Sequence, residues 1–534
     1  MYRVFEQRLS EISRSASPEL FNGSQIGLEK ESLRVASQGG VAQTKHPISL
    51  GSALTHPHIT TDYSEALLEF VTPPYADKSE LLNFLRDSQT FVYSQLAQDE
   101  ILWSASMPCV LEGEQSIPIA EYGDSNLGKM KTVYRRGLGH RYGRLMQVIA
   151  GVHFNFSFSS KFWDYFQDLE KSSEDPQAFI SKSYFQLIRN FQRYGWLIPY
   201  LFGSSPTVCR SFLNGKETDM EEFDATTYYY PYATSLRMGD IGYQNKKEDK
   251  SGIHVNYDSV SNYVESLRDA ITTPHPEFEQ LGVKVDGRYQ QLNSNLLQIE
   301  NEYYSSVRPK QIANVFEMPI TALTERGVAY IELRSLDINS QEPEGVSEDS
   351  LYFLEAFVLF CLLHDSPPIT QDEYSCISKN MLDVAHKGRD PKLLLNLCDN
   401  KKLSLQSWGN ELFSLMQGVG EILDDQNDDR YSRALKKYQS YIDEPDSTPS
   451  ARIVEEMRKT QEGFFHFSLR KSQEHAEYFK NRRITAPQVN YFEQLSRKSI
   501  EQQKLIEAND SISFDDFLKY YFDQTLQSVA GHGM

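Results

Sequence analysis

The sequence predicts an α+β fold, with antiparallel strands in its first part and helices in its second. Before about residue 345, apolar and polar side chains alternate along several short segments. This alternation is typical of antiparallel strands that have one buried and one solvated face. Beyond that point, apolar residues recur at helical spacing among many Glu, Lys, Gln and Arg residues. Together these patterns indicate a sheet backed by helices.

The helical part is expected to pack onto the sheet-containing part as one domain. Helical spacing is found near 348–364, 405–424, 429–443, 452–481 and 487–508. The breaks between these segments are short, and none is a long Gly/Ser-rich or Pro-rich linker. No repeat of fixed period is present. We therefore expect a single domain over 1–534, with a sheet-containing catalytic part (1–345) and a mainly helical part (346–534).

Each predicted strand carries acidic, imidazole or other polar side chains on one face. Alternate residues of a strand point to opposite faces, so His153 and Asn155 lie opposite Val152, Phe154 and Phe156 in segment 151–158. The other predicted strands and their polar residues are 26–33 (Glu29, Glu31), 66–71 (Glu69), 295–304 (Gln298, Glu300, Glu302, Tyr304) and 328–334 (Tyr330, Glu332, Arg334).

The repetition of acid along these faces is the informative feature. One Glu on such a strand is ordinarily solvated, but like charges on neighbouring strands repel one another. We hypothesise that five residues converge on one sheet face and bind cations: Glu29, Glu31, Glu69, His153 and Glu332. Carboxylates with one imidazole suit Mg²⁺, with Mn²⁺ as an alternative. Because Mg²⁺ is commonly shared with substrate phosphates, such a site indicates a nucleotide substrate.

Charge excludes two classes of partner. The 534 residues contain 54 Lys and Arg against 74 Asp and Glu, a formal net charge of −20. This balance argues against nucleic-acid binding and against adhesion to an anionic membrane. A phosphate site needs only a local basic cluster, and the Arg-rich, Gly-interrupted segment 134–144 offers one, although it could equally be a solvated basic patch.

One apparent phosphate-binding loop is discounted. Residues 123–129 fit the pattern GxxxxGK, but Met130 stands where a Ser or Thr is needed to reach Mg²⁺. No strongly apolar strand precedes the segment. A Rossmann glycine motif in its strand–turn–helix context is also absent from the sequence.

The cysteines and the N-terminal residues indicate a cytoplasmic protein. The five cysteines include no CxxC pair, so we expect reduced thiols, with Cys109 a packed thiol rather than a nucleophile. The first residues do not resemble a secretory signal. The most apolar long segment, 353–363, is too short to cross a bilayer and is interpreted as a buried helix.

The sequence resembles bacterial glutamate–cysteine ligases (γ-glutamylcysteine synthetases) of the long single-chain gammaproteobacterial type. The resemblance rests on Gly-Leu-Glu-Lys-Glu-Ser-Leu-Arg at 27–34, Gly-Val-His-Phe-Asn-Phe-Ser at 151–157 and Tyr-Ile-Glu-Leu-Arg-Ser-Leu-Asp-Ile-Asn at 330–339. Further matching stretches occur, in the family's order, at 50–56, 59–62, 65–73, 106–109, 146–147, 195–203, 231–237, 242–243, 298–302 and 308–310. The helical part resembles the family only loosely, so no site residue is transferred from it.

The resemblance implies a fold and a reaction. The family's fold is similar to the catalytic half of glutamine synthetase, in which a curved antiparallel sheet backed by helices forms a funnel. The implied reaction is ATP-dependent ligation of the L-glutamate γ-carboxylate to the L-cysteine amine through γ-glutamyl phosphate, the first step of glutathione biosynthesis. Expected partners are glutamate, cysteine and ATP, with feedback inhibition by glutathione and a monomeric protein.

The resemblance also implies roles for individual residues. The metal-binding positions would be Glu29, Glu31, Glu69, His153 and Glu332, and Arg334 together with Glu332 would be catalytic. The cysteine pocket would contain Tyr134, Arg237, Tyr243 and Tyr304. Gln147 and Arg135 are placed near the substrate by their neighbourhood alone.

Two other classes of function remain open from the residues themselves. A metal-dependent hydrolase could use the same carboxylates to activate water. Alternatively, a binding protein could have an acidic sheet face that is merely solvated.

Overall fold

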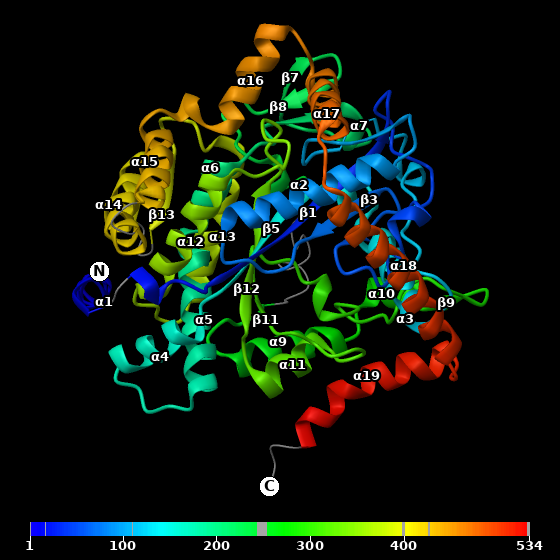
Figure 1. Ribbon diagram of the computed structural model, residues 1–534, viewed down its shortest axis with the longest axis horizontal. Helices are drawn as coiled ribbons and strands as arrows, with labels where there is room; N and C mark the ends of the chain where they lie inside the picture. The colour runs from blue at the N-terminus through cyan, green and yellow to red at the C-terminus, as the bar shows by residue number, and fades with distance from the viewer. Residues whose placement is uncertain are drawn as a thin grey trace.

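The centre of the fold is a seven-stranded antiparallel sheet, seen in a computed structural model that describes residues 2–15, 18–108, 110–242, 254–397, 401–424 and 428–530 (Figure 1). The strand order is β11-β12-β5-β1-β3-β2, and β4 pairs with the end of β1. The strands are β1 (Gln25–Ala36), β2 (Ile59–Thr61), β3 (Leu67–Val71), β4 (Glu100–Leu102), β5 (Gly151–Ser157), β11 (Val307–Lys310) and β12 (Tyr330–Asp337).

The pairing register places the predicted acidic positions beside one another. Strand β1 lies between β3 and β5, so Glu29 is opposite His153 on one side while Glu31 is opposite Glu69 on the other. On the far side of β5, Glu332 of β12 is opposite Asn155. Because neighbouring strands are in register and side chains alternate, these residues share one face of the sheet.

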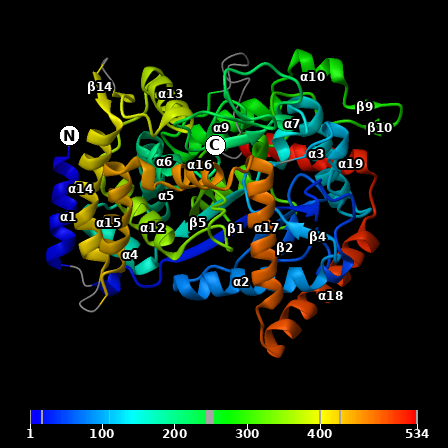
Figure 2. The ribbon, with the colours of Figure 1, turned by 90° about the horizontal axis from the view of Figure 1, so that it is seen from above.

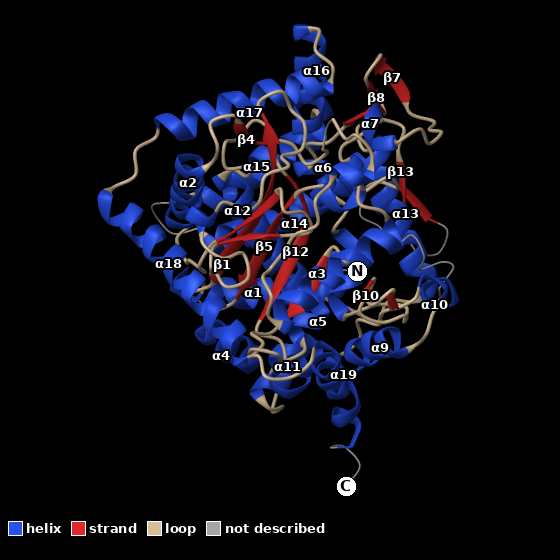
Figure 3. Ribbon diagram, turned by 90° about the vertical axis from the view of Figure 1, so that its right-hand side faces the viewer, coloured by secondary structure: helices blue, strands red, loops and turns tan. Residues whose placement is uncertain are grey.

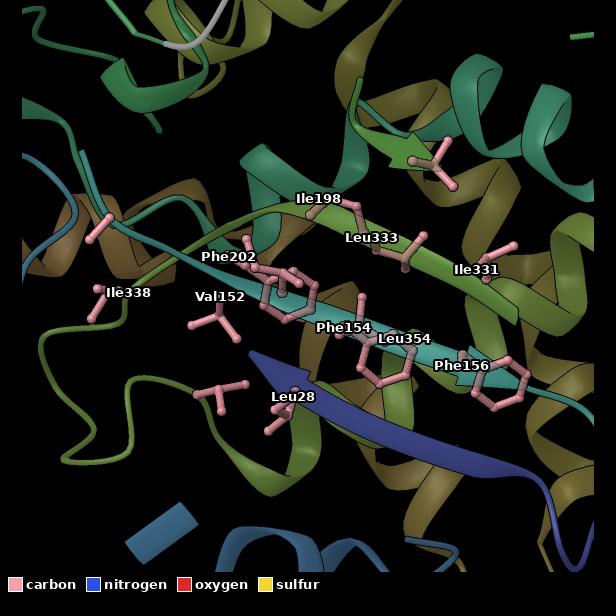
Figure 4. Close-up of a cluster of buried hydrophobic side chains, with 14 of the residues drawn as sticks. Leu28, Val152, Phe154, Phe156, Ile198, Phe202, Ile331, Leu333, Ile338 and Leu354 are labelled. Atoms are coloured by element: carbon pink, nitrogen blue, oxygen red, sulfur yellow. The ribbon is translucent and has the colours of Figure 1, made fainter. Parts of the chain in front are cut away.

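The opposite face of the sheet is the hydrophobic core. Figure 4 shows Val152, Phe154 and Phe156 of β5 among apolar side chains from β1, β12, α6 (Leu197–Phe202) and α12 (Glu348–Leu363). All three β5 side chains are essentially inaccessible to solvent. Since burying one such side chain stabilises a fold by about 1.5–3 kcal/mol, this face fixes which side of each strand remains available for the site.

Helix α12 is the buried helix expected at 353–363. Ser347 caps its N-terminus by accepting a hydrogen bond from the Ser350 amide, and Ser350 to Leu363 are all buried. It packs against α5 (Pro176–Tyr194), α14 (Leu405–Leu423) and α15 (Arg430–Asp443). A helix that is apolar all round requires such neighbours on every side.

The remaining helices of the second part surround this core at both ends of the molecule. Figures 1 and 2 show α14 and α15 beside α1 (Arg3–Ser15) at one end and α18 with α19 at the other. In Figure 3 the strands of the large sheet lie in the interior with helices around them. The other helices of this part are α13 (Gln371–Lys387), α16 (Pro449–Thr460), α17 (Phe464–Asn481), α18 (Ala486–Asn509) and α19 (Phe514–Ala530).

Smaller elements complete the first part. They are α2 (Lys78–Gln95), α3 (Asn126–Tyr142), α4 (Ser160–Leu169), α7 (Arg210–Leu213), α9 (Val260–Thr272), α10 (Pro276–Leu281) and α11 (Pro319–Arg326), a three-stranded sheet of β6 (Thr207–Cys209), β8 (Thr227–Tyr229) and β7 (Glu221–Asp224), and the hairpin of β9 (Lys284–Val285) and β10 (Arg288–Tyr289). A second hairpin, β13 (Leu394–Leu397) with β14 (Lys401–Ser404), lies within the mainly helical part.

The predicted α+β class is confirmed, and three local predictions are wrong. Segment 295–304 is not a strand but an irregular loop with a single 3₁₀ turn, Glu300–Glu302. Segment 452–481 is two helices rather than one, because the chain turns at Gln461, which has a positive φ of 56°. Finally, Cys209 is disulfide-bonded, whereas we expected reduced thiols; Cys109 and Cys398 lie outside the described residues.

Candidate active site

A cavity of about 380 Å³ opens over the polar face of the sheet. Strands β1, β3, β5, β11 and β12 form its floor, and α3 with the loop before β11 forms its walls. It brings together all eleven described site candidates, which come from different parts of the sequence: Glu29, Glu31, Glu69, Tyr134, Arg135, Gln147, His153, Arg237, Tyr304, Glu332 and Arg334. The remaining candidate, Tyr243, lies outside the described residues.

Three of the five predicted metal positions form a compact group of ligand atoms. In the described part of the chain, Glu29, Glu69 and His153 each offer one atom, and these atoms all lie within 4.8 Å of one another. Nδ1 of His153 is 3.0 Å from Oε2 of Glu29, and Nδ2 of Asn155 donates to Oε1 of Glu29 at 3.0 Å. The side chains are therefore held in a geometry that one divalent cation could bridge.

The other two predicted metal positions adjoin this group but are engaged with the protein. Oε1 of Glu31 is 3.9 Å from Nε2 of His153, while its Oε2 accepts a hydrogen bond from the Gly151 amide at 2.6 Å. Oε1 of Glu332 lies 3.4 Å from Nδ1 of His153. Both carboxylates thus reach the imidazole, from opposite sides of β5.

Burial and like charge act together on the acidic cluster. Burial raises the pKa of Glu69 well above its usual range, and the nearby carboxylates of Glu29 and Asp62 raise it further. Burial likewise raises the pKa of Glu31, although His153 partly opposes the shift. Carboxylates in this state gain stability from a cation that compensates their charge.

Glu332 is in the opposite electrostatic situation. Burial alone would raise its pKa, but the cations of Arg334 and Lys310 hold the pKa well below the usual range. Nη1 of Arg334 donates to Oε1 at 2.7 Å, and Nζ of Lys310 lies 3.1 Å from Oε2. The site therefore has an acidic end near β3 and a balanced end near β11 and β12.

Helix α3 presents a basic and aromatic face to the cavity. It begins at a Ser125 cap, whose side chain accepts a hydrogen bond from the Gly128 amide. Residues three or four apart on a helix share a face, and Lys131, Tyr134 and Arg135 all line the cavity. Nη2 of Arg135 is 3.9 Å from a carboxylate oxygen of Asp62, which also lines the cavity. Residues 134–142 of the Arg-rich segment are thus helical, and Arg135 is the arginine of this segment that lines the cavity.

The two remaining candidates sit on 3₁₀ turns next to the sheet. Arg237 lies in the turn Leu236–Met238, with its guanidinium buried against β12. Gln147 lies in the turn Met146–Val148 just before β5 and is also buried. Tyr304, at the end of the loop that precedes β11, donates its hydroxyl to the Met238 sulfur at 3.3 Å. Arg237, Gln147 and Tyr304 all line the cavity.

Comparison with known proteins assigns the chain to a family. A family model described as glutamate-cysteine ligase matches residues 9–384. The chain belongs to the glutamate–cysteine ligase family. It is 45% identical to a glutamate–cysteine ligase of Alcanivorax borkumensis over 97% of this chain and 99% of that protein. It is also 45% identical to one from Pseudomonas putida, over 98% of each chain.

Solved structures agree with this assignment. A glutamate–cysteine ligase from Francisella tularensis in complex with AMP superposes with a TM-score of 0.89 at 35% identity, covering 94% of this chain and 98% of that one. A bifunctional glutathione synthetase from Pasteurella multocida shares the fold, with a TM-score of 0.73 at 23% identity over 92% of this chain and 58% of that one. This member of the glutamate–cysteine ligase family is an enzyme of the ligase class.

The residues of this ligase-family site fit a hard divalent cation. Oxygen donors with one imidazole are the ligands that Mg²⁺ or Mn²⁺ prefers over softer metals. Burial and the carboxylates of Glu29 and Asp62 raise the pKa of the Glu69 carboxyl, and a bound divalent cation would favour its ionised form. Glu29, Glu69 and His153 would hold such an ion, with Glu31 and Glu332 beside them.

Several cavity residues were missed from the sequence. Asp62, Lys131 and Lys310 line the cavity but were not predicted as site residues. Lys310 is two residues from Arg308 on β11 and lies on the same strand face, and this shared parity was a usable signal within a stretch that resembles the family. Asp62 follows β2 in a loop, where no periodicity indicates which way a side chain points.

The loop 295–304 reaches the site differently from the strand that we expected. Glu302 lies against the cavity but is paired with Arg141 of α3 at 2.9 Å, and both side chains are fully buried. Glu300 instead points toward α11, where it accepts a hydrogen bond from the Ile320 amide. The shared parity predicted for these residues is therefore wrong.

The discounted GxxxxGK segment leads into α3. Hydrogen-bond donors at the start of this helix already have protein acceptors. Nδ2 of Asn126 donates to Oδ1 of Asp510 at 3.0 Å, and the Asn126 amide donates to the other oxygen of the same carboxylate. The Asp124 amide donates to Oε1 of Glu507 at 3.1 Å. Because residues at the end of α18 satisfy this helix N-terminus, the site where a phosphate would bind is filled by protein carboxylates.

No helix of sufficient length and apolar character to span a bilayer is found among the described residues.

Proposed function

We propose that this protein joins the γ-carboxylate of L-glutamate to the amine of L-cysteine, with conversion of ATP to ADP and phosphate. The product would be γ-L-glutamyl-L-cysteine, the first intermediate of glutathione biosynthesis. The observation that carries the proposal is a cavity in which several arginines meet an acidic cluster that could bind a cation, in a chain of this ligase family. The AMP bound to the Francisella tularensis relative supports ATP as the nucleotide.

The chemistry explains why both kinds of charge are present. A carboxylate is a poor electrophile, so the γ-carboxylate is first phosphorylated to γ-glutamyl phosphate. Transfer of a phosphoryl group depends on positioning and on neutralisation of charge. Bound Mg²⁺ (or Mn²⁺) would neutralise phosphate charge, held by Glu29, Glu69 and His153 with Glu31 and Glu332 adjoining.

Arg334 supplies the positive charge at the balanced end of the site. Its guanidinium is oriented by the 2.7 Å hydrogen bond to Glu332 and lines the cavity. We propose that it donates to the phosphoryl group as negative charge develops in transfer, a role in which a preorganised guanidinium is effective.

The acceptor amino acid would bind beside Arg334 in the same cavity. Arg237, Tyr134 and Tyr304 are proposed to contact cysteine there, with Tyr243, Gln147 and Arg135 nearby in the proposed pocket. The amine nitrogen of cysteine attacks the carbonyl carbon of the acyl phosphate, the C–N bond of the amide forms, and the C–O bond to phosphate breaks as phosphate leaves. We propose that Asp62, whose side chain is 39% exposed and faces this cavity, accepts the amine proton.

We also propose the following properties for the whole protein. The two parts form one domain, a proposal supported by a continuous buried cluster that includes residues of both the sheet and the C-terminal helices. It acts as a cytoplasmic monomer, is inhibited by its pathway's end product glutathione, and binds neither nucleic acid nor membranes. The net charge of −20 supports the last of these.

Phosphate release from ATP tests the function. We expect release to require glutamate, cysteine and Mg²⁺ together and to yield a peptide product. Turnover without ATP, or turnover that needs no cysteine, would instead support a metal-dependent hydrolase. No turnover with any combination would favour a binding protein. Comparing cysteine with 2-aminobutyrate measures how much the thiol contributes.

A further inference from the structure

Arg237 is supported from behind by a residue that does not line the cavity. The Arg237 side chain is only 2% exposed, and Nη2 donates to the backbone carbonyl of Arg334 at 2.8 Å. Nη1 lies 3.8 Å from Oδ1 of Asp337, a carboxylate that is completely buried. Asp337 is the last residue of β12 and is absent from the cavity lining, so it reaches the site only through its neighbours.

Asp337 also anchors the turn that carries Arg237. Its Oδ2 accepts hydrogen bonds from the Ser204 amide at 2.8 Å and the Ser205 hydroxyl at 2.6 Å, while Oδ1 accepts from the Ser235 hydroxyl at 2.9 Å. Ser235 is the N-cap of the 3₁₀ turn Leu236–Met238, and its side chain accepts from the Met238 amide. One carboxylate thus fixes both the backbone turn and the charged end of Arg237.

The backbone of β12 is shaped to complete this support. Its register against β5 shifts between Leu333 and Leu336, which marks a β-bulge that includes Arg334. Such bulges are frequent beside active sites, where they redirect backbone groups. Opposite Asp337 in the register is Gly151, where an added Cβ would lie 2.1 Å from Nη2 of Arg237. Glycine is therefore required for the guanidinium to approach the sheet.

We propose that Asp337 is a positioning residue, which holds Arg237 so that its guanidinium receives the α-carboxylate of the acceptor amino acid. The α-carboxylate is the anionic group of cysteine at neutral pH, and a guanidinium with a fixed orientation binds a carboxylate well. The inference rests on the proposed function, because it assumes that the acceptor binds in the cavity beside Arg237.

The substitution Asp337→Asn separates charge from hydrogen bonding. The amide oxygen can accept from Ser204 and Ser205, and the amide nitrogen can donate to Ser235, whose hydroxyl is free to rotate. The negative charge facing Arg237 is lost. We expect the KM for cysteine to rise about tenfold, with the KM values for glutamate and ATP unchanged and kcat within threefold of wild type.

Hydroxylamine provides an acceptor without a carboxylate. It traps γ-glutamyl phosphate as a hydroxamate, so it reports the first half of the reaction. We expect equal hydroxamate formation by the wild type and Asp337→Asn, because hydroxylamine has no carboxylate for Arg237 to bind. A parallel loss of hydroxamate formation and peptide formation would overturn the proposal in favour of general structural damage.

Two further variants keep the test decisive. In an Arg237→Ala background, which itself should raise the KM for cysteine, Asp337→Asn should add less than a twofold change. If the two effects multiply, Asp337 does not act through Arg237. Ser235→Ala keeps the charge of Asp337 but removes the hydroxyl that donates to Asp337 and accepts from the Met238 amide. It should raise the KM for cysteine two- to threefold, and it carries the test if Asp337→Asn does not fold.

The matched control is Asp87→Asn. Asp87 is another buried aspartate beside an arginine, 2.5 Å from Arg482, but it lies on α2 away from the cavity. Its substitution should leave the KM for cysteine unchanged. A wild type without glutamate- and cysteine-dependent phosphate release would refute the proposed function, whereas an active wild type with an unchanged cysteine KM in Asp337→Asn would refute only this inference.

Discussion

The ion pair between α2 and α12 and the acidic cluster on the sheet are both buried, but they balance their charges differently. Nζ of Lys78 lies 2.5 Å from Oε2 of Glu355, with side chains only 5% and 6% exposed. The Tyr431 hydroxyl donates to the same carboxylate at 2.8 Å, and the ammonium sits 4.5 Å from the centre of the Tyr352 ring. Each charge in this pair is matched within the protein.

At the β3 end of the acidic cluster the balance is poorer, because Arg135 lowers the pKa of Glu69 less than burial and the neighbouring carboxylates raise it. Glu29 and Glu69 share one imidazole, and like charge together with burial keeps the pKa of the Glu69 carboxyl high. Breaking a matched buried pair costs stability, whereas removing one of several like charges relieves repulsion. Unbalanced buried charge therefore marks the place where a ligand completes the structure, while balanced buried charge marks a structural contact.

The largest expected effect is on catalysis at the acidic cluster. We predict that Glu29→Gln and Glu69→Gln each lower kcat/KM at least ~10³-fold, equivalent to about 4 kcal/mol of transition-state stabilisation, because the cation loses a ligand. Steady-state phosphate release at fixed Mg²⁺ measures this. Near-native turnover in either variant would show that its carboxylate is not a metal ligand.

In the metal-free protein, Glu69→Gln should not lower the free energy of unfolding. The pKa of Glu69 is higher in the folded than in the unfolded protein, so the folded state binds the extra proton and loses stability as pH rises through the raised pKa. Glu69→Gln should therefore flatten this fall when metal-free protein is unfolded with urea at several pH values. A stability loss at high pH that is as large in the variant as in the wild type would contradict the electrostatic account.

The next largest effect is on stability at the matched pair. Lys78→Met should lower the free energy of unfolding by about 3–5 kcal/mol, since it leaves the Glu355 carboxylate buried and uncompensated. Denaturant unfolding measures the loss, and turnover per folded molecule should not change. The double variant Lys78→Met/Glu355→Leu is the control and should recover most of the stability. If it stays as unstable as the single variant, packing rather than charge is responsible.

The smallest effect concerns a buried imidazole outside the site. Burial lowers the pKa of His475 from 6.5 to about 3, and its Nδ1 contacts the Ser104 hydroxyl at 2.9 Å. Since only the unfolded chain binds this proton between pH 6.5 and 3, the stability is complete above pH 6.5 and is lost as pH falls. The loss at pH 5 is about 2 kcal/mol.

His475→Asn retains a polar group near Nδ1 but cannot titrate. Between pH 7 and pH 5, its unfolding free energy should fall by about 2 kcal/mol less than that of the wild type. Urea unfolding of both proteins at the two pH values gives this difference directly, because the contributions of the other histidines cancel. Parallel pH dependences would show that His475 is protonated in the folded state.

Strand parity is what made much of the site predictable. Because side chains alternate with a period of two, the assignment of β1, β5 and β12 as strands already placed Glu29, His153 and Glu332 on polar faces. The resemblance to a ligase family then added residues such as Arg237 that no periodicity selects. The convergence of the strands depends on their order in the sheet, which is a tertiary property.

The failures have a common physical cause. The alternation in 295–304 arises from side chains that satisfy separate tertiary partners: Glu302 pairs with Arg141, and Glu300 accepts from the Ile320 amide. The break between α16 and α17 runs from Gln461 to Gly463, and a Cβ at Gly463 would lie 2.0 Å from Oδ2 of Asp224. Neither a distant ion pair nor a close backbone approach leaves a local pattern in the sequence.

The hydrogen bonds between Asp510 and the N-terminus of α3 have a consequence for folding during protein synthesis. Asn126 and Asp510 are 384 residues apart. At about 5–20 residues per second, a ribosome needs roughly 20–80 s to translate that interval. Throughout it, the helix that carries Tyr134 and Arg135 lacks its C-terminal partner. The nascent chain therefore acquires its complete cavity wall only near the end of translation, so an interrupted polypeptide holds the sheet ligands but not the finished pocket.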